Sequence, residues 1–297
     1  QLKLTRMKNK FSKVFFTVIL LTSIQFFGQE DNDDSKSNIQ TYTPSKLLDK
    51  GQWDIKFFNN LYTQNKAANS SGKSISIQRE NYFTSTLDIF TGVSDNNRLN
   101  VGLLLEYRSN TINGKSATSV FGFKDDVNSR NGLSSFAPAI KWQPIESVGN
   151  FSIQSAFHIP VNDSETDANG VFLDQTAYMF QNRFFYDYTF PSGDWQLFTE
   201  LATEYNFGDE DSFANKTFVL APGIFMSYFP TDKSTILGFV QHYQRFGDFT
   251  QDFSALGFGG KYQLNNTLNL EVLYSKFVRG TDNGLGQSFN IGLRALF

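Results

Sequence analysis

The amino-acid sequence predicts an all-β fold, a closed barrel of twelve antiparallel strands that crosses a membrane. Runs of alternating apolar and polar residues fill most of the chain, and long connections alternate with short ones. Residues 287–297 form a last strand with one apolar and one polar side, and the chain ends on Phe297. The alternation has a period of two, which places successive side chains on opposite faces of a strand.

Composition narrows the class of protein. The chain has 297 residues and no cysteine, which excludes disulfides, thiolate metal sites and cysteine catalysis. The net charge of −3 provides no basic surface for nucleic acid. A mean hydropathy of −0.33 resembles that of a soluble protein. A transmembrane barrel has a similar value, because only every second strand residue faces lipid.

The N-terminal region predicts an exported protein. Met7 is the expected start, so residues 1–6 are excluded from the fold. Residues 8–13 carry three lysines, and 14–27 form an apolar run with a predicted cleavage site near 28–30. This is the pattern of a cleaved signal peptide within residues 1–29. The alternative is a membrane anchor, but the run is shorter than the ~20 apolar residues that a spanning helix needs.

Residues 30–52 are predicted to be a polar periplasmic segment before the barrel domain at 53–297. The acidic stretch 31–37 is expected to be disordered. For residues 43–49, two interpretations stay open. They form a short turn or helix that tucks under or into the barrel, or they are a plain linker.

The twelve strands follow one another in a repeated unit of an alternating run and a turn. Their lengths suit strands that cross a bilayer at a tilt, which need roughly 9–11 residues. The predicted strands are 53–63, 82–92, 99–110, 133–143, 151–160, 177–190, 195–205, 217–229, 234–246, 253–264, 267–279 and 287–297.

The lengths of the connections indicate which end of the barrel faces the periplasm. Connections 64–81, 111–132 and 161–176 are long, whereas 93–98 and 191–194 are short and rich in turn residues. Outer-membrane barrels have an even strand count, short periplasmic turns and longer outer loops. The sequence therefore predicts an outer-membrane barrel of a Gram-negative bacterium with both termini in the periplasm.

The two faces of each strand differ in chemistry. In strand 99–110, Leu103 and Leu105 lie on one face and Glu106 and Arg108 on the other. An apolar face towards lipid and a charged face towards a lumen explain this pattern. The near balance of acids and bases predicts internal ion pairs rather than a strongly charge-selective pore. Twelve strands enclose less space than a sixteen-stranded porin, which predicts a narrow lumen. The predicted lumen residues are Asp54, Lys56, Asp88, Glu106, Arg108, Lys141, His158, Arg183, Asp187, Glu200, Glu204, Lys261, Glu271 and Arg294.

Aromatic residues near strand ends predict a membrane girdle. With the first strand running outward, all three tryptophans fall at the periplasmic end. The predicted girdle consists of Trp53, Trp142, Trp195, Tyr188, Tyr228 and Phe297.

Two proline-bearing fragments, F-A-P-A-I-K and L-A-P-G-I-F, place Pro138 and Pro222 well inside their strands. A proline there removes a donor from the ladder. Each proline marks a bulge, a kink or a local opening of the wall, or is simply a tolerated irregularity.

These fragments carry a family resemblance. The terminal strand ending in phenylalanine resembles the closing strand of outer-membrane barrels, which is their signal to the barrel-assembly machinery. With G-Q-W-D-I-K-F at the first strand, the chain also resembles transporter-like barrels grouped under phenol degradation by the MetA pathway. That resemblance implies uptake of small apolar or aromatic compounds, although no long N-terminal plug like that of fatty-acid channels is evident.

Signals for catalysis or cofactors are poor, and the chain is not expected to be an enzyme. His242 has no partner motif of the kind found in outer-membrane phospholipases, and no phosphate loop or metal-ligand cluster occurs. Acidic side chains in loop 162–170 alternate as calcium ligands can, but a solvated acidic loop is the simpler interpretation. No cofactor and no metal are predicted.

The sequence thus predicts passive transport or binding of small molecules through a narrow charged lumen, with membrane lipid as partner and the cargo unknown. The alternative is a structural barrel with a sealed lumen, which binds a partner through outer loops such as 111–132.

Overall fold

The structure is a computed structural model and describes residues 44–297. Its regular elements are strands and a single 3₁₀ helix, η1 (Ala117–Gly122). The strands are β1 (Trp53–Ala68), β2 (Ser74–Gly92), β3 (Leu99–Thr111), β4 (Ser129–Trp142), β5 (Phe151–Pro160), β6 (Tyr178–Thr189), β7 (Trp195–Phe207), β8 (Thr217–Thr231), β9 (Ser234–Gly247), β10 (Gln251–Gln263), β11 (Leu268–Thr281), the two-residue β12 (Asn283–Gly284) and β13 (Gln287–Leu296).

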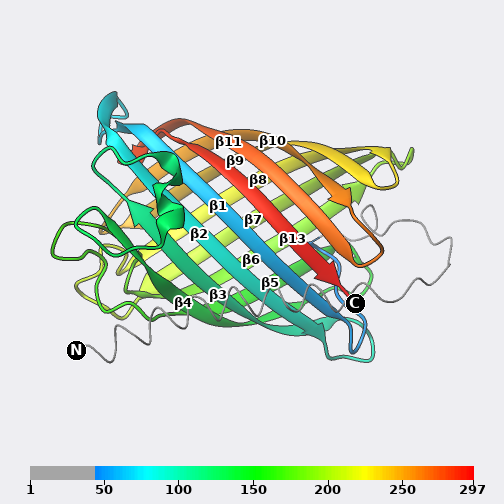
Figure 1. Ribbon diagram of the computed structural model, residues 1–297. Coiled ribbons are helices and arrows are strands. Elements are labelled where there is room, and N and C mark those ends of the chain that lie inside the picture. Colours follow the sequence, from blue (N-terminus) through cyan, green and yellow to red (C-terminus); the bar gives the residue numbers. More distant parts are fainter. Residues whose placement is uncertain (1–43) are drawn as a thin grey trace. The chain divides into compact units, whose positions relative to one another are not determined.

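The long strands form a closed antiparallel barrel (Figure 1). Each long strand pairs with the next long strand in sequence, and β1 pairs with both β2 and β13. The short β12 pairs with the end of β1. The pairing of Asp54 with Leu296 and of Lys56 with Arg294 closes the circle. A closed barrel leaves no unpaired sheet edge, which is what a bilayer requires of strands. The prediction of a twelve-stranded barrel is confirmed, and no helix among residues 44–297 has the length and apolar character of a membrane span.

The connections differ between the two ends of the barrel. One end, which we call the loop end, carries the connections 112–128, 161–177 and 208–216. The opposite end, the turn end, carries 93–98, 143–150, 190–194, 232–233 and 264–267. The C-terminus lies at the turn end (Figure 1).

The first hairpin is longer than predicted. Residues 64–81 were expected to be a loop, but β1 and β2 continue to Ala68 and from Ser74. Gln64 donates to Glu80 across the two strands at 2.7 Å. The side chain of Asn69 accepts from the backbone N–H of Ser71 and Lys73 and so closes a tight turn. Polar cross-strand bonds replace apolar contact there, which is why the sequence looked like a loop.

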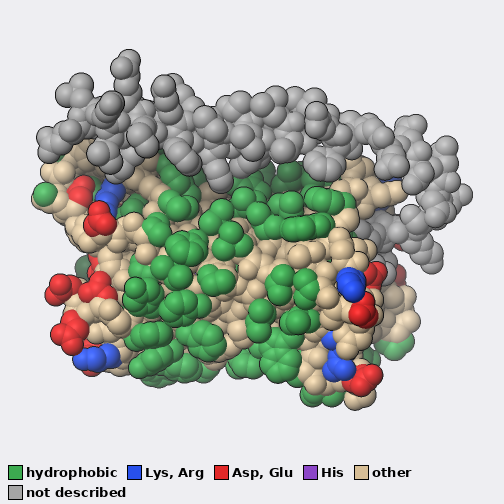
Figure 2. Space-filling view, turned by 90° about the horizontal axis from the view of Figure 1, so that it is seen from below, with side chains coloured by type: hydrophobic (Ala, Val, Ile, Leu, Met, Phe, Trp, Pro, Cys, Tyr) green, Lys and Arg blue, Asp and Glu red, His purple; other side chains and the backbone are tan. Residues whose placement is uncertain are grey.

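Apolar side chains cover the outside of the barrel. They fill the middle of the face in Figure 2, while charged side chains gather towards its two ends. Large residues such as Ile236 and Phe258 expose 59% and 64% of their surface. An apolar surface this extensive needs apolar surroundings, because soluble monomers rarely expose a large contiguous patch. The outer wall is therefore suited to lipid.

Each strand proline lies at a gap in the pairing with one of its two neighbouring strands. The β4–β5 ladder passes from Phe136 to Ala139 and omits Pro138. The β8–β9 ladder passes from Leu220 to Gly223 and omits Pro222. Each site lacks a donor because proline has no backbone N–H. The predicted irregularity is present at both sites.

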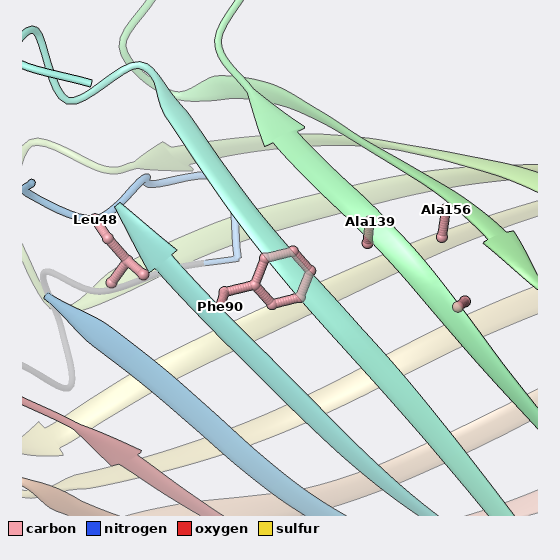
Figure 3. Close-up of a cluster of buried hydrophobic side chains, with 5 residues drawn as sticks. Leu48, Phe90, Ala139 and Ala156 are labelled. Carbon is pink, nitrogen blue, oxygen red and sulfur yellow. The ribbon is translucent and has the colours of Figure 1, made fainter. Parts of the chain in front are cut away.

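A short segment before β1 plugs the turn end from inside, which resolves the choice between a tucked segment and a linker. Leu48 is completely buried against Phe90, Ala139 and Ala156 (Figure 3). Its backbone N–H donates to the side-chain oxygen of Asn100 at 3.2 Å. We call residues 44–50 the plug segment.

The connections 161–177 and 208–216 pack together at the loop end, where Glu165 accepts a hydrogen bond from Ser212 and the ring centroids of Phe172 and Phe213 lie 6.0 Å apart. Connection 112–128 packs through η1 on Phe83 of β2, and we call the three connections the loop cap. Val120, Val171 and Ala214, one from each connection, are completely buried. Asn110 of β3 donates to the backbone carbonyl oxygens of Phe172 and Leu173 at 2.8 and 3.0 Å. The cap is therefore fixed to the barrel wall by both apolar contact and hydrogen bonds.

Candidate functional site: the charged lumen

The barrel encloses a cavity of about 390 Å³. Its lining comes from strands all around the barrel and from Pro44 of the plug segment, so the cavity lies in the lumen. Eight predicted lumen residues line it: Lys56, Asp88, Lys141, Arg183, Glu200, Lys261, Glu271 and Arg294. A smaller cavity of about 170 Å³ shares Asp88 and Arg183 and is also lined by Glu106 and His158.

The four remaining predicted residues contact other polar groups instead. Asp54 binds Arg294, and Arg108 binds Glu106. Glu204 accepts a hydrogen bond from Gln181 at 3.1 Å. The buried carboxylate of Asp187 accepts one from Gln196 at 3.5 Å.

An ion pair fastens the seam where the barrel closes. The Arg294 guanidinium donates from Nε to Asp54 Oδ1 at 2.7 Å and from Nη2 to Oδ2 at 2.8 Å. Lys56 Nζ lies 3.5 Å from the same carboxylate. Two parallel charge-assisted bonds give this contact both strength and a fixed geometry. Asp54 therefore neutralises two lumen cations on the paired strands β1 and β13.

Further ion pairs cross neighbouring strands. Arg183 of β6 donates to Glu200 of β7 at 2.6 Å, and Lys261 of β10 lies 2.9 Å from Glu271 of β11. These contacts agree with the prediction that lumen charges are paired.

A carboxylate of the loop cap joins this network. Arg108 lies 2.6 Å from Glu106 and 3.1 Å from Asp174 of the 161–177 connection. Burial raises the pKa of Asp174 to about 6, although Arg108 acts in the opposite direction. The sequence analysis missed Asp174, because strand alternation assigns no face to a loop residue.

Lys141 stands apart from these pairs. Its side chain is buried, and Nζ donates to the backbone carbonyl oxygen of Lys46 at 3.0 Å. Within the described chain it has no carboxylate within ion-pair distance. This lysine therefore fixes the plug segment and forms no ion pair with the described residues.

A row of phenylalanines forms one wall of the lumen. The ring centroids of Phe185 and Phe198 lie 6.0 Å apart, those of Phe198 and Phe225 5.4 Å, and those of Phe225 and Phe239 5.3 Å. The four come from the consecutive strands β6, β7, β8 and β9. We call them the phenylalanine ladder.

The ladder was also missed, since only charged residues were assigned to the lumen. Strand parity would have located it. Phe185 falls in step with Arg183, and Phe198 falls in step with Glu200.

The six predicted girdle residues all lie at the turn end and are exposed on the outer wall. Trp195 packs on Tyr228, with ring centroids 4.8 Å apart. Trp53 and Phe297 exchange two backbone hydrogen bonds of 2.6 and 3.0 Å. Their depth in a bilayer stays a prediction.

The histidines differ in their surroundings. His158 lines the smaller cavity, and its Nε2 atom has no partner among the described residues. His242 Nδ1 lies 2.9 Å from the hydroxyl oxygen of Ser254. Within residues 44–297, His242 makes no side-chain hydrogen bond to a carboxylate or amide.

No group of potential metal ligands occurs within the described residues. In the loop considered for calcium, Asp167 accepts from the backbone N–H groups of Asn169 and Val171. Glu165 accepts from the hydroxyl of Ser212. These carboxylates stabilise the loop cap.

A closed barrel with an apolar outer wall and a charged lumen defines the class: this chain has the fold of an outer-membrane β-barrel. An outer membrane channel from Pseudomonas putida F1 has the same architecture, with a TM-score of 0.68 and 10% identity over 86% of this chain and 99% of the channel. The β domain of the Bordetella autotransporter BrkA gives a TM-score of 0.56 and 13% identity, over 84% of this chain and all of that domain. At these identities the likeness establishes the fold alone. No protein-family model and no curated protein sequence matches the chain.

Proposed function

We propose that the protein resides in the outer membrane of a Gram-negative bacterium and passes or binds small molecules. The observation that carries the proposal is the lumen cavity of about 390 Å³, which lies in the range of small-molecule sites, roughly 300–1,000 Å³. Its wall combines charged groups with phenylalanines, so it suits solutes with both polar and apolar parts. The similarity to a channel and the predicted resemblance to transporter-like barrels point the same way.

The lengths of the connections support an orientation of the barrel in the membrane. We propose that the turn end faces the periplasm and the loop end faces outward, as in other outer-membrane barrels. The predicted signal peptide at residues 1–29 would deliver the chain for export, and it lies outside the described residues. The C-terminal strand β13 would be the contact for the barrel-assembly machinery.

The plug segment and the loop cap restrict passage of solutes through the lumen. Leu48 is completely buried against the barrel wall at one end, and Val171 and Leu173 are buried at the other. We expect low conductance that rises when either closure is loosened.

Single-channel conductance of refolded protein in a planar bilayer, with and without small aromatic solutes, tests the proposal. Steady conductance that a solute blocks or alters supports a transport pathway. A demonstrably folded barrel that neither conducts ions nor admits a small solute, even after deletion of 162–176, refutes it.

The alternative is a structural barrel that acts through its loop cap. The compact packing of the cap favours it, and Phe121 of η1 still exposes 48% of its surface. Deletion of residues 113–127 distinguishes the two functions. Loss of a binding or surface phenotype with unchanged conductance supports the structural barrel, whereas an unchanged phenotype counts against it.

We propose no catalytic role. Among residues 44–297, the hydrogen bond between His242 and Ser254 resembles the contact between an enzyme's nucleophile and base. Lipid turnover by the purified protein, compared with His242→Ala and His158→Ala, decides the matter. Turnover that disappears in either variant contradicts the channel-only function.

A further inference from the structure

We propose that the lumen cavity is selective for aromatic carboxylates. The carboxylate would bind to Lys141, Gln154 and Arg183, and the ring would pack on the phenylalanine ladder. This inference rests on the proposed function and names its substrate class.

The three polar residues form one row on the inner wall. Lys141 of β4 is the register partner of Gln154 of β5, and Gln154 is the register partner of Arg183 of β6. Side chains of directly paired residues project from the same face and lie next to each other. All three line the cavity, so their donors converge on one part of its wall.

Two members of the row have unused capacity for an anion. Lys141 and Gln154 are each 5% exposed. Gln154 Nε2 has no hydrogen-bond partner among the described residues, and Lys141 Nζ donates only to the carbonyl oxygen of Lys46. A buried donor without an acceptor costs free energy, and so does a buried charge without a counter-charge. A bound carboxylate supplies both an acceptor and a charge.

The other cations of the cavity are already matched. Arg183 pairs with Glu200, Lys261 with Glu271, and Lys56 and Arg294 share Asp54. Asp88 also lines the cavity, and it is the register partner of Lys56. Lys141 lines the same cavity but makes no ion pair with a described carboxylate, which makes this part of the lumen the place for an anion.

The aromatic wall lies beside this anion site. Lys141 Nζ is 5.6 Å from the ring centroid of Phe185, and the Arg183 guanidinium carbon is 5.1 Å from it. Phe198 and Phe225 extend the ring surface away from the two cations and also line the cavity. A solute with a carboxylate attached directly to an aromatic ring can reach both features at once.

This arrangement predicts selection on both parts of the solute. A neutral aromatic supplies no anion to Lys141. A small aliphatic anion leaves the phenylalanine ladder without a ring to pack against. Offset or edge-to-face aromatic contacts favour the ring over an aliphatic group.

The test uses benzoate, its neutral isostere benzamide, and acetate. Isothermal titration calorimetry of the refolded full-length barrel in micelles measures binding of each. We expect benzoate to bind at least about tenfold more tightly than either of the others, since hydrogen bonds to charged groups contribute about 1.5–3 kcal/mol and 1.4 kcal/mol is tenfold. Benzamide or acetate binding as tightly as benzoate overturns the inference.

Variants assign the two parts of the site. Lys141→Met is expected to weaken benzoate binding at least about tenfold and to leave benzamide unchanged. Phe198→Leu is expected to weaken benzoate and benzamide severalfold and to leave acetate unchanged. The matched control is Lys233→Met in an exposed turn, which should change none of the three.

Folding is checked by the heat-dependent mobility of the barrel on gels. Gln154→Leu serves if Lys141→Met does not fold, and it should weaken benzoate more than benzamide. Unchanged benzoate binding in a folded Lys141→Met or Gln154→Leu barrel overturns the inference.

The bilayer measurement separates this inference from the proposed function. A barrel that conducts without preferring benzoate keeps the channel function and loses the substrate class. A barrel that prefers benzoate through Lys141 without conducting keeps the binding site and loses the passage.

Discussion

Replacement of Asp54 by asparagine should destabilise the barrel strongly, because Asp54 is the shared counter-charge at the closing seam. Its carboxylate takes two hydrogen bonds from Arg294, at 2.7 and 2.8 Å, and lies 3.5 Å from Lys56. Only 4% of the residue is exposed. Lys56 and Arg294 are direct register partners on β1 and β13. Without the carboxylate, two cations face each other across the seam.

The magnitude follows from the cost of breaking a buried ion pair, about 3–5 kcal/mol when one partner is removed. Urea unfolding of the refolded barrel in lipid vesicles, followed by tryptophan fluorescence, measures it. With a slope of about 1–3 kcal/mol per molar urea, the midpoint should fall by at least about 1 M.

Asp95→Asn is the matched control, because Asp95 forms an ion pair of 2.6 Å with Lys50 whose side chains are 89% and 59% exposed. Exposed pairs contribute little, so its midpoint should barely move. The double variant Asp54→Asn/Lys56→Met removes one of the facing cations and should recover part of the loss. Equal midpoints for Asp54→Asn and Asp95→Asn would refute the reasoning.

Three further predictions concern the two closures. Leu48→Ala should lower the free energy of unfolding by about 2–5 kcal/mol and raise single-channel conductance, since it leaves a void in the plug segment; unchanged conductance contradicts a closing role for this residue. The pKa of Asp174 is raised to about 6, so the folded barrel favours the protonated carboxyl. This contribution to stability is fully present below the ordinary pKa of an aspartate and is lost as pH rises through 6. The difference in urea midpoint between Asp174→Asn and the parent should therefore grow from pH 5 to pH 8 in favour of the variant, and a constant difference argues against it. Glu165→Ala removes the acceptor for the hydroxyl of Ser212 and for the backbone N–H of Phe213. Limited proteolysis should therefore cut the loop cap faster while the barrel strands stay protected. Equal cutting rates would show that Glu165 does not hold the cap.

Alternation along the chain was sufficient to predict the barrel wall. A side chain's face depends only on its parity in a strand, so Leu103 and Arg108 could be assigned to opposite faces without knowing their neighbours. The same rule places the phenylalanine ladder on the inner face of the barrel. It went unnoticed because phenylalanine is apolar, and apolar residues were all assigned to lipid.

Strand parity could not predict which side chains contact each other across strands and loops. Lys141, Gln154 and Arg183 come from three strands, and only the register of β4, β5 and β6 places them in one row. The contact of Asp174 with Arg108 depends on how the 161–177 connection folds back on β3. The plug segment had two open interpretations until Leu48 was found in contact with Phe90.

The sequence by itself determined the class, the strand count and the charged inner face, because each depends on local period and on turn residues. The tertiary structure decided which charges pair, where the cavity lies and what closes its two ends. Those depend on strand register and on loop packing, which join residues as far apart in the chain as Asp54 and Arg294.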